Sequence, residues 1–443
     1  MTPSLARWQA DFEEFTGNGG GAASAWLRGT RDRAMQRFTA LGFPTVKLEE
    51  WRFTNVAPVA ETAFALPHSP RAGAPSAREI RSFELCEAGR HLIVFVNGRY
   101  SGALSSVAGL PAGVRVGSLA DALRADDAIV QTHVGRYAGV DDRPFAALNT
   151  AFLYDGGFVH VPAGVSMDEP VQVLYLTVPG STPVVSHPRT LVVAERGARC
   201  AFVETFAAHG EGVYFTNAVT EIVAADGARV DCYRIQRESE QAYHVATTAT
   251  HQGRDSTINL HAVVFGAALA RHDIGVVLAG ENGLALLNGL YILGGSQHAD
   301  HHTTIDHAQP HCESHEYFNG VLDARSRGVF NGRIIVRPGA QRTDSKQTNN
   351  NLVLSEEARA DSQPQLEIYA DDVKCTHGAT LGPIDEQALL YLKSRGIPPA
   401  QARSLLTYGF GAEIIGRMAI APLQAQLERM VRRRLLGTAG PAA

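Results

Sequence analysis

The amino-acid sequence predicts a mainly β fold, a β-solenoid that lies between helical regions at the two ends of the chain. Apolar residues follow a helical period over about the first 50 and the last 60 of the 443 residues. From about residue 91 the period becomes that of extended strands, and between residues 190 and 370 one unit recurs: an apolar run, a short polar turn and another apolar run. No helical pattern separates these strands, which disfavours a doubly wound α/β fold with its helical crossovers. A sandwich of long strands is the structural alternative.

The N-terminal region is predicted to hold two helices. Leu5, Trp8, Phe12 and Phe15 recur at steps of three or four residues, and a second helix is expected around residues 25–41, after a GNGGG break. The segment that follows, GFPTVKLEEWRFTNV, contains a proline that ends the helix. Its mixture of charges and aromatic rings predicts an ordered turn that packs on a neighbouring element.

The central region is predicted to stack as a solenoid, in which each coil buries its apolar face only against the next coil. A strand is expected from residue 91, followed by a turn at Asn97-Gly98 and another strand. The later turns are placed at Gly197, Gly227, Asp255, Asn282, Arg325 and Arg359. Their steps are about 30, 28, 27, 43 and 34 residues, and the long step predicts an insert within a histidine-rich stretch.

The last 60 or so residues return to a helical pattern. Asp385 is the predicted N-cap of a first helix that ends at Gly396, and a second helix is expected to run to about Leu406. After Gly409 and Gly411 a third helix is expected, with an apolar stripe that continues to residue 435. This bundle either caps the end of the solenoid or docks a partner. The predicted domains are therefore residues 1–90, 91–380 and 381–443.

Composition excludes several classes of protein. Forty basic against 45 acidic side chains give a net charge of −5, so a basic nucleic-acid binder is ruled out. The five cysteines form no CxxC pair, and neither a disulfide scaffold nor a zinc ribbon is expected. The first residues lack the apolar core of a secretory signal, and no apolar run has the length of a membrane span, so a cytoplasmic protein is predicted. No phosphate loop or dinucleotide fingerprint is present, and this chain is not expected to bind a nucleotide.

Six histidines crowd residues 298–315 together with Cys312. One hypothesis is a metal site on His301, His307 and Cys312 that serves a stand-alone metal-dependent enzyme. In an extended strand, however, His301 and His307 point to one face and His302 points to the other, so the cluster divides between two surfaces. Polar ladders on a solenoid face are the competing explanation.

A second candidate group lies at the junction of the strand region and the helical end, in EIYADDVKCTHGATLG. Cys375 and His377 are two residues apart, so in a strand they share a face with about 7 Å between their Cα atoms. Two ligands are too few for a closed metal or iron–sulfur site. Such a site would need ligands from elsewhere in the chain or from another subunit, and a structural role for the pair is the alternative.

These last segments carry a resemblance to a known family. The stretch from residue 317 to residue 397, which includes NGRIIVRPGAQRTDSKQTNNNLVLSEEARADSQPQLEIYADDVKCTHGATLG, closely resembles the SufB/SufD family of iron–sulfur cluster assembly proteins. The resemblance is strong over about the last 150 residues and looser over the preceding strands. FPTVKLEEWRFTNV and the VKCTHGAT form resemble the SufD branch.

The resemblance implies a right-handed parallel β-helix and a non-catalytic scaffold subunit of a SufBCD-type complex. Such a subunit pairs with a SufB-like paralogue and docks a SufC-like ABC-type ATPase, whose ATP-driven motion exposes a cluster-building site at the paralogue junction. Cys375 and His377 would be this chain's half of a site for a transient iron–sulfur cluster. A homodimer of the isolated chain and flavin binding stay open. The side chains expected to bind the ATPase lie in the C-terminal helices: Asp385, Tyr391, Tyr408, Phe410, Ile414 and Met418.

Overall fold

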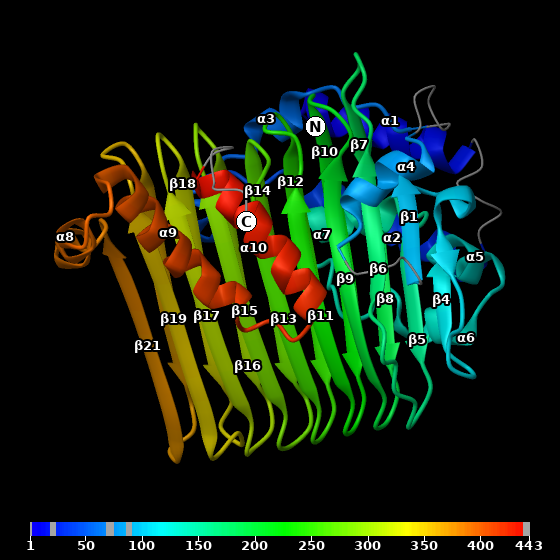
Figure 1. The fold of residues 1–443 in the computed structure, drawn as a ribbon. Coiled ribbons are helices and arrows are strands. Elements are labelled where there is room, and N and C mark those ends of the chain that lie inside the picture. Colours follow the sequence, from blue (N-terminus) through cyan, green and yellow to red (C-terminus); the bar gives the residue numbers. More distant parts are fainter. Residues whose placement is uncertain (1, 18–23, 68–74, 86–90, 437–443) are drawn as a thin grey trace.

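The computed structural model describes residues 2–17, 24–67, 75–85 and 91–436, and its strands form a β-solenoid of about 8 turns. Helices lie at both ends of the chain (Figure 1). The predicted fold class is confirmed, because the stacked strands pair in parallel from one coil to the next rather than facing each other as two antiparallel sheets. The glycine break predicted at residues 18–21 lies outside the described residues.

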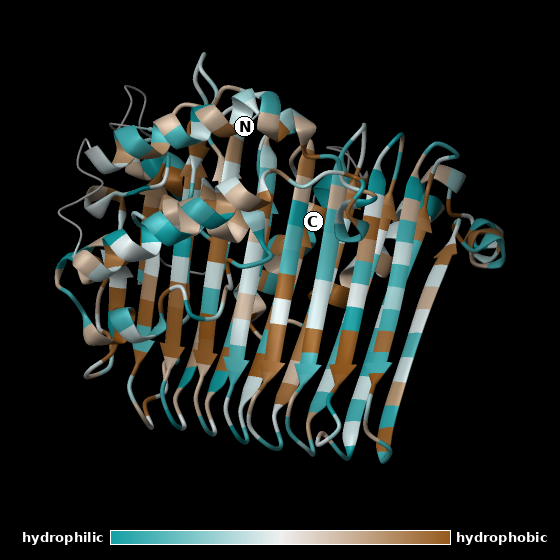
Figure 2. Ribbon diagram, turned by 180° about the vertical axis from the view of Figure 1, so that it is seen from behind, coloured by the Kyte–Doolittle hydropathy of each residue, from teal (hydrophilic) through white to brown (hydrophobic). Residues whose placement is uncertain are grey.

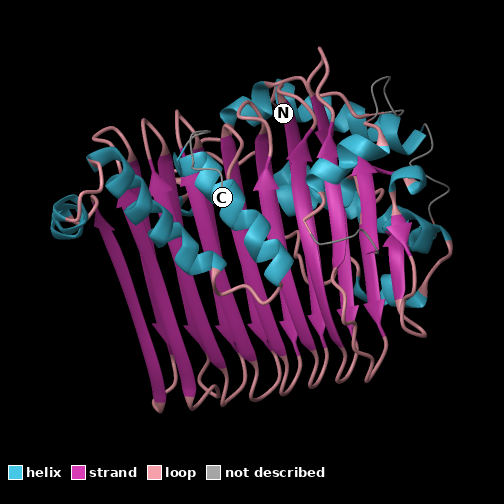
Figure 3. Cartoon of the chain, in the orientation of Figure 1, coloured by secondary structure: helices cyan, strands magenta, loops and turns pink. Residues whose placement is uncertain are grey.

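From β8 onward, successive strands of the chain alternate between two sheets, as the path of a solenoid requires (Figures 1 and 3). Sheet A contains β4 (Arg115–Ser118), β5 (Gly157–Val161), β7 (Val184–Ser186), β8 (Arg189–Ala194), β10 (Tyr214–Ala224), β12 (Tyr243–Gln252), β14 (Leu269–Leu278), β16 (His298–His307), β18 (Arg327–Val336) and β20 (Arg359–Ile368). Sheet B contains β1 (His91–Val96), β2 (Arg99–Tyr100), β3 (Ser106–Val107), β6 (Val171–Thr177), β9 (Arg199–Ala208), β11 (Arg229–Arg237), β13 (Thr257–Val264), β15 (Leu284–Leu293), β17 (Glu313–Leu322), β19 (Thr343–Val353) and β21 (Val373–Gly382). The main core fills the space between the sheets, since every second residue of each strand points inward.

The helices cover the outer faces of the two sheets at different places. The N-terminal and linking helices are α1 (Pro3–Gly17), α2 (Ala25–Leu41), α3 (Ala57–Glu61), α4 (Ala77–Ile80), α5 (Leu119–Arg124), α6 (Ala128–His133) and α7 (Pro144–Ala151). The C-terminal helices are α8 (Glu386–Ser394), α9 (Pro399–Ile415) and α10 (Ala421–Leu436). Apolar residues of α1, α2 and α7 pack on β10 and β12 of sheet A, whereas those of α9 and α10 pack on β11, β13, β15 and β17 of sheet B. Among the described residues, no helix is long and apolar enough to cross a membrane.

Part of the outer face of sheet A is not covered by helices (Figure 2). Seen from behind, its strands toward β20 alternate between hydrophilic and hydrophobic residues along their length (Figure 2). The burial pattern of β18 shows the same alternation, with Phe330, Ile334 and Val336 buried and Asn331 and Arg333 partly exposed. The period of two follows from the pleat, which sends successive side chains to opposite faces.

The coil period is more regular than the sequence predicted. Six residues with positive φ mark the turns at one edge: Gly197, Gly227, Asp255, Asn282, His311 and Arg342. Their steps are 30, 28, 27, 29 and 31 residues, so no coil carries an insert. The predicted step of 43 residues was wrong because Arg325 belongs to the turns at the opposite edge, between β17 and β18. The turn equivalent to Asn282 is at His311, and histidine, like asparagine and aspartate, is enriched among the non-glycine residues at positive φ.

The aromatic segment after α2 docks on sheet A, as its composition predicted. Trp51 is buried, and the guanidinium of Arg271 lies 3.7 Å from the centroid of its ring. Arg271 also donates to the carboxylate of Asp300 at 2.8 Å, and the Thr54 hydroxyl bonds the same carboxylate. These contacts fix the N-terminal region to β14 and β16, far along the chain from it.

The first C-terminal helix begins and ends as predicted, but the boundary between the second and the third differs from the prediction. The helix α9 continues through Gly409 and Gly411 to Ile415. The interruption between the second and third helices lies at residues 416–420 instead. Ile414 and Ile415 are fully buried against sheet B. Burial of two such side chains outweighs the cost of about 1 kcal/mol for each glycine in a helix interior.

Candidate functional site

Cys375 and His377 lie on β21, the last strand of sheet B. In the parallel register of β19 and β21, Cys375 pairs with Ser345 and His377 pairs with Gln347. Ser345 and Gln347 are buried, with 0% and 1% of their surface exposed, because they point into the solenoid. Since paired residues in register face the same way, Cys375 and His377 point along the interior face of the final coil. The predicted sharing of one face is confirmed.

The final coil is uncovered on that interior face. Cys375 is half-buried beside Ile334 and Val336, and His377 is exposed. Two apolar residues of the same coil, Ile368 on β20 and Leu381 on β21, are 40% and 62% exposed. In the described part of the chain, β20 pairs only with β18 and β21 only with β19, so each keeps one free edge. Unpaired strand edges and exposed apolar residues together are typical of a surface that takes a partner.

A hydrogen-bonded ladder leads from the interior to Ser345, the residue in register with Cys375. The Nε2 of His307 lies 2.8 Å from the Ser314 hydroxyl, and this hydroxyl lies 2.8 Å from that of Ser345. Ser314, Ser345 and Cys375 follow one another in register on β17, β19 and β21. The thiol is thus the last group of a polar column that begins two coils deeper.

A second ladder leads to Gln347, the residue in register with His377. The Nε2 of Gln347 donates to a carboxylate oxygen of Glu316 at 2.5 Å, and Glu316, Gln347 and His377 follow one another in register. Glu316 is 2% exposed, and burial raises the pKa of its carboxyl to about 7. The Glu316 carboxyl therefore changes its charge near neutral pH. It lies on β17, the neighbour of the strand β19 that carries Gln347.

Replacing Glu316 by glutamine is expected to stabilise the protein at alkaline pH. Because the pKa of Glu316 is higher in the folded chain than in the unfolded chain, the unfolded chain loses the proton first as pH rises, and stability falls through that range. The variant should gain about 1 to 3 kcal/mol in the free energy of unfolding at pH 8 and nothing at pH 4. Urea unfolding at both pH values measures this, with Glu313→Gln on the exposed side of the same strand as control. An equal gain at both pH values would contradict the assigned pKa.

The Cys375 thiol is kept protonated by its surroundings. Burial raises the pKa of this thiol, and the nearby carboxylate of Asp344 raises it further. A thiol binds a metal ion only after it has lost its proton. The positive charge of an approaching cation would therefore have to favour the thiolate form of Cys375 before the sulfur could bind it. The geometry offers one sulfur and one imidazole nitrogen, which is half of a four-ligand set.

The structure divides the histidine-rich stretch between the two faces of β16. As predicted, His301 and His307 are buried on the inner face of β16, whereas His302 lies on the other face beside Asp300, 3.1 Å from its carboxylate. The ring of His301 stacks on Tyr291 with 5.1 Å between centroids, and burial lowers its pKa to about 4. The Cys312 thiol donates to a backbone carbonyl at 3.3 Å. Within the described residues, no three histidine, cysteine, aspartate or glutamate side chains are placed to hold a metal ion, and the metal hypothesis for His301, His307 and Cys312 finds no support.

The residues predicted to bind a partner differ in their exposure. Tyr391 on α8 is 58% exposed, whereas Tyr408 and Phe410 on α9 are partly buried against the cluster that α9 and α10 form with sheet B. Ile414 and Met418 are 0% and 5% exposed in the same cluster, so they hold the helices on the sheet. Binding of a partner by any of these side chains stays a prediction.

Asp385 is the N-cap of α8, as its sequence context predicted. Its carboxylate accepts from the backbone N–H groups of Gln387 and Ala388 at 2.8 and 3.4 Å. Asp385→Ala is expected to cost about 1 kcal/mol of local stability and to fray the first turn of α8. Hydrogen exchange of the α8 amides measures this, with Glu386→Ala as control. Unchanged exchange in Asp385→Ala would show that the cap is not needed.

Sequence reasoning missed the stacking of the inner ladder residues, above all Ser345 and Gln347, behind Cys375 and His377. Their signal was the coil period: residues 314, 345 and 375 are separated by 31 and 30 positions, and so are residues 316, 347 and 377. With the false step of 43 residues, these positions could not be aligned from one coil to the next.

Comparison with known proteins identifies the family. Residues 177–410 match the family model described as "SUF system FeS cluster assembly, SufBD core domain", and residues 10–173 match "SufBD protein N-terminal region". The chain is 32% identical to an iron–sulfur cluster assembly SufBD family protein of Synechocystis sp., over 94% of this chain and 93% of that protein. It is 31% identical to the iron–sulfur cluster assembly protein SufD of Escherichia coli, over 91% of this chain and 92% of that one, and 29% identical to SufD of Bacillus subtilis, over 67% and 68%. The chain therefore belongs to the SufBD family of iron–sulfur cluster assembly proteins.

Proposed function

We propose that this chain is a non-catalytic scaffold subunit for iron–sulfur cluster assembly, which pairs with a SufB-like paralogue through the open end of its solenoid. One observation carries the proposal: the uncovered last coil presents Cys375 and His377 between free strand edges and exposed apolar side chains. A second β-solenoid placed against this coil would extend the sheets and bury Leu381 and Ile368. It would also bring the further ligands that a cluster needs.

The cluster is cargo in this proposal, built at the junction and passed on. Cys375 supplies a thiolate and His377 a neutral imidazole, and both are ligands that iron accepts. An imidazole nitrogen in place of a sulfur is expected to hold the cluster less firmly, which suits a scaffold that releases its product. Backbone pairing with β19 fixes the two residues on β21, and their outer atoms would be available to the metal.

We further propose that a SufC-like ABC-type ATPase docks on α8 and α9. The side chains of Leu390 and Tyr391 on α8 are 65% and 58% exposed, and Leu405 on α9 is 41% exposed. α8 follows β21 directly in the chain, so a pull on this helix would act on the strand that carries both ligands. In this proposal, a nucleotide bound to the ATPase moves α8 of this chain. Such a movement is a shift between two arrangements of the interface between the two proteins.

Co-expression with the two partners tests both surfaces at once. Leu381→Asp, at the open coil, is expected to lose the paralogue, while Lys374→Asp, on the opposite face of the same strand, keeps it. Tyr391→Ser is expected to lose the ATPase and keep the paralogue. Affinity purification followed by light scattering gives the mass of each assembly. Retention of the paralogue by Leu381→Asp would place the pairing surface elsewhere, and failure of the unaltered chain to bind either partner would overturn the proposal.

A further inference from the structure

A cavity of about 80 Å³ lies on the outer face of sheet A, where the N-terminal region and α7 meet the strands β12, β14, β16 and β18. Its wall is made by the segment around Trp51, by the residues that begin α7, and by outward-facing side chains of the four strands. A buried water needs about 10 to 15 Å³, so the cavity has room for about five to eight waters. A small tetrahedral ion fits in the same space.

The helix α7 begins at the wall of this cavity without a cap. Only its first three residues, Pro144, Phe145 and Ala146, line the cavity, so the cavity lies beyond the N-terminal end of the helix. The Arg143 side chain, at the N-cap position, makes no capping hydrogen bond. The backbone N–H groups of Phe145 and Ala146 have no acceptor among the described residues, although the two residues are 3% and 0% exposed. Buried N–H groups normally have an acceptor, and the N-terminus of a helix favours an anion.

A hydroxyl of a buried residue opens on the same cavity. Thr247 on β12 is 3% exposed and lines the cavity. Its hydroxyl has no hydrogen-bond partner among the described residues, and the protein does not enclose it completely. The unbonded hydroxyl of a residue that is otherwise buried therefore faces the cavity. It is a ready donor for an acceptor group placed there.

Two arginines at the wall keep donors for a ligand. The Nη1 and Nη2 of Arg143 lie 3.7 and 3.8 Å from the position that a Cβ on Gly275 would take, so this guanidinium rests on the bare backbone of β14. Arg143 is paired with Asp142 at 4.0 Å, and Arg333 is paired with Glu367 at 3.8 Å. Both distances are too long for hydrogen bonds, so neither guanidinium is firmly held by its carboxylate.

The carboxylates at the wall are either bonded by an arginine or exposed to solvent. Asp273 accepts from Arg271, from Nε at 3.2 Å and from Nη2 at 2.8 Å. The remaining nitrogen of Arg271, Nη1, donates to Asp300 at 2.8 Å. Glu50 is exposed, and so is 86% of the Asp142 side chain, which lets solvent screen both charges. The two weakly paired guanidinium groups are therefore available to a ligand in the cavity.

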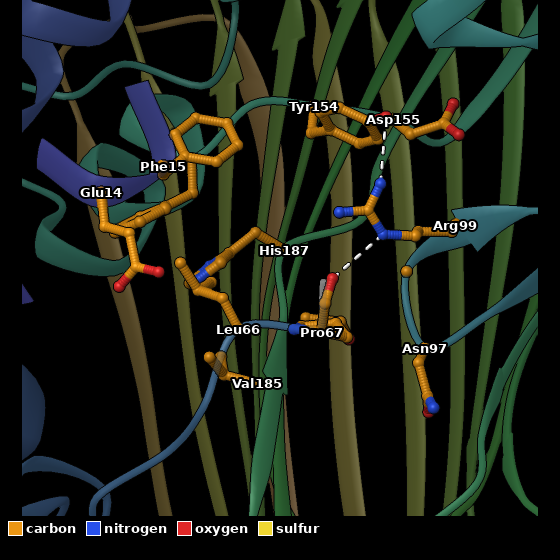
Figure 4. Close-up of a pocket in the computed structure, with 13 residues that line it drawn as sticks. Glu14, Phe15, Leu66, Pro67, Asn97, Arg99, Tyr154, Asp155, Val185 and His187 are labelled. Atoms are coloured by element: carbon orange, nitrogen blue, oxygen red, sulfur yellow. Dashed lines mark hydrogen bonds between the residues drawn. The ribbon is translucent and has the colours of Figure 1, made fainter. Parts of the chain in front are cut away.

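Another cavity, of about 90 Å³ between α1 and β7, lacks this combination of free donors (Figure 4). The arginine in its wall, Arg99, already donates from Nε to the Pro67 carbonyl at 3.0 Å and from Nη1 to the Tyr154 hydroxyl at 3.1 Å. The helix α1 contributes Glu14 and Phe15 from its last turn, and therefore none of its N-terminal N–H groups. Free donors distinguish the cavity at the start of α7.

We propose that the cavity at the start of α7 binds a free tetrahedral oxyanion of the phosphate or sulfate class. The anion accepts from the N–H groups of Phe145 and Ala146, from the Thr247 hydroxyl, and from the guanidinium groups of Arg143 and Arg333. Hydrogen bonds from charged donors are about twice as strong as those from neutral ones, and the N-terminus of α7 favours the same charge. The site contains none of the residues of the proposed cluster site, so it does not depend on that function.

Calorimetric titration of the full chain with inorganic phosphate at low salt tests the site. The unaltered chain is expected to bind phosphate saturably, and Arg143→Gln should weaken binding at least about tenfold because a charged donor is lost. Thr247→Val keeps the shape of the side chain without its hydroxyl and should weaken binding about three- to tenfold. Arg229→Gln, on the other sheet, is the control and should bind like the unaltered chain.

Thermal unfolding with and without phosphate separates loss of binding from loss of folding. Phosphate should raise the unfolding temperature of the unaltered chain and of Arg229→Gln, and should raise it less in folded Arg143→Gln and Thr247→Val. No saturable binding to the unaltered chain, or unchanged binding in both cavity variants, would overturn the proposal. An equal loss in Arg229→Gln would also overturn it, because it would indicate an adventitious ion only.

Discussion

Replacing His377 by alanine is expected to lower the yield of assembled cluster at least about tenfold in the co-expressed complex, without loss of the complex itself. The side chain is exposed on the open coil, so its removal creates no cavity, and the strand keeps its backbone pairing to β19. What is lost is one of the two ligands that we propose for this chain. Absorbance and iron content of the purified complex measure the yield.

The control for this prediction lies on the same strand. Thr376 is also exposed but points to the outer face of β21, so Thr376→Ala removes a side chain of similar size without touching the proposed site. This variant should assemble clusters at the unaltered rate. A His377→Ala complex with full cluster yield would remove His377 from the site and leave the pairing of the solenoid ends untouched.

Replacing Arg189 by methionine is expected to lower the free energy of unfolding by about 3 to 5 kcal/mol. Arg189 is fully buried, and its Nε and Nη2 donate to one oxygen of Glu221 at 3.0 and 2.8 Å. Its Nη1 donates to Asn149 and Thr150 of α7, both at 3.0 Å. The variant would leave the Glu221 charge buried without its cation, and it would also break the link between α7 and sheet A.

Urea unfolding of Arg189→Met and Arg229→Met provides the measurement. Arg229 is on β11 of sheet B and 52% exposed, and it pairs with Asp231 at 3.2 Å. An exposed pair of this kind is worth less than about 1 kcal/mol. Equal losses in the two variants would mean that the buried network around Arg189 does not stabilise the fold as its geometry indicates.

Local patterns in the sequence were sufficient for the elements. The period of two along β16 separated His301 and His307 from His302 correctly, because the pleat fixes the direction of each side chain from its neighbours alone. The cap at Asp385 was likewise predictable, since it depends on a few adjacent residues. For the segment around Trp51, composition predicted only that it packs on a neighbour, whereas its contact with Arg271 joins distant parts of the chain. The shared face of Cys375 and His377 was predicted for the same reason.

Contacts between distant residues were decided only by the tertiary structure. Stacking of Ser345 beneath Cys375 and of Gln347 beneath His377 depends on the length of every turn between coils, and one turn placed at the wrong edge shifts the whole alignment. The passage of α9 through two glycines depends on burial of Ile414 against sheet B, which local propensity does not contain. The sequence by itself determined that this protein is a stack of coils with a thiol and an imidazole on its last strand. Only the packing of one coil on the next decided that this strand is uncovered and that buried polar ladders stand behind both residues, because register across coils is set by contacts far apart in the chain.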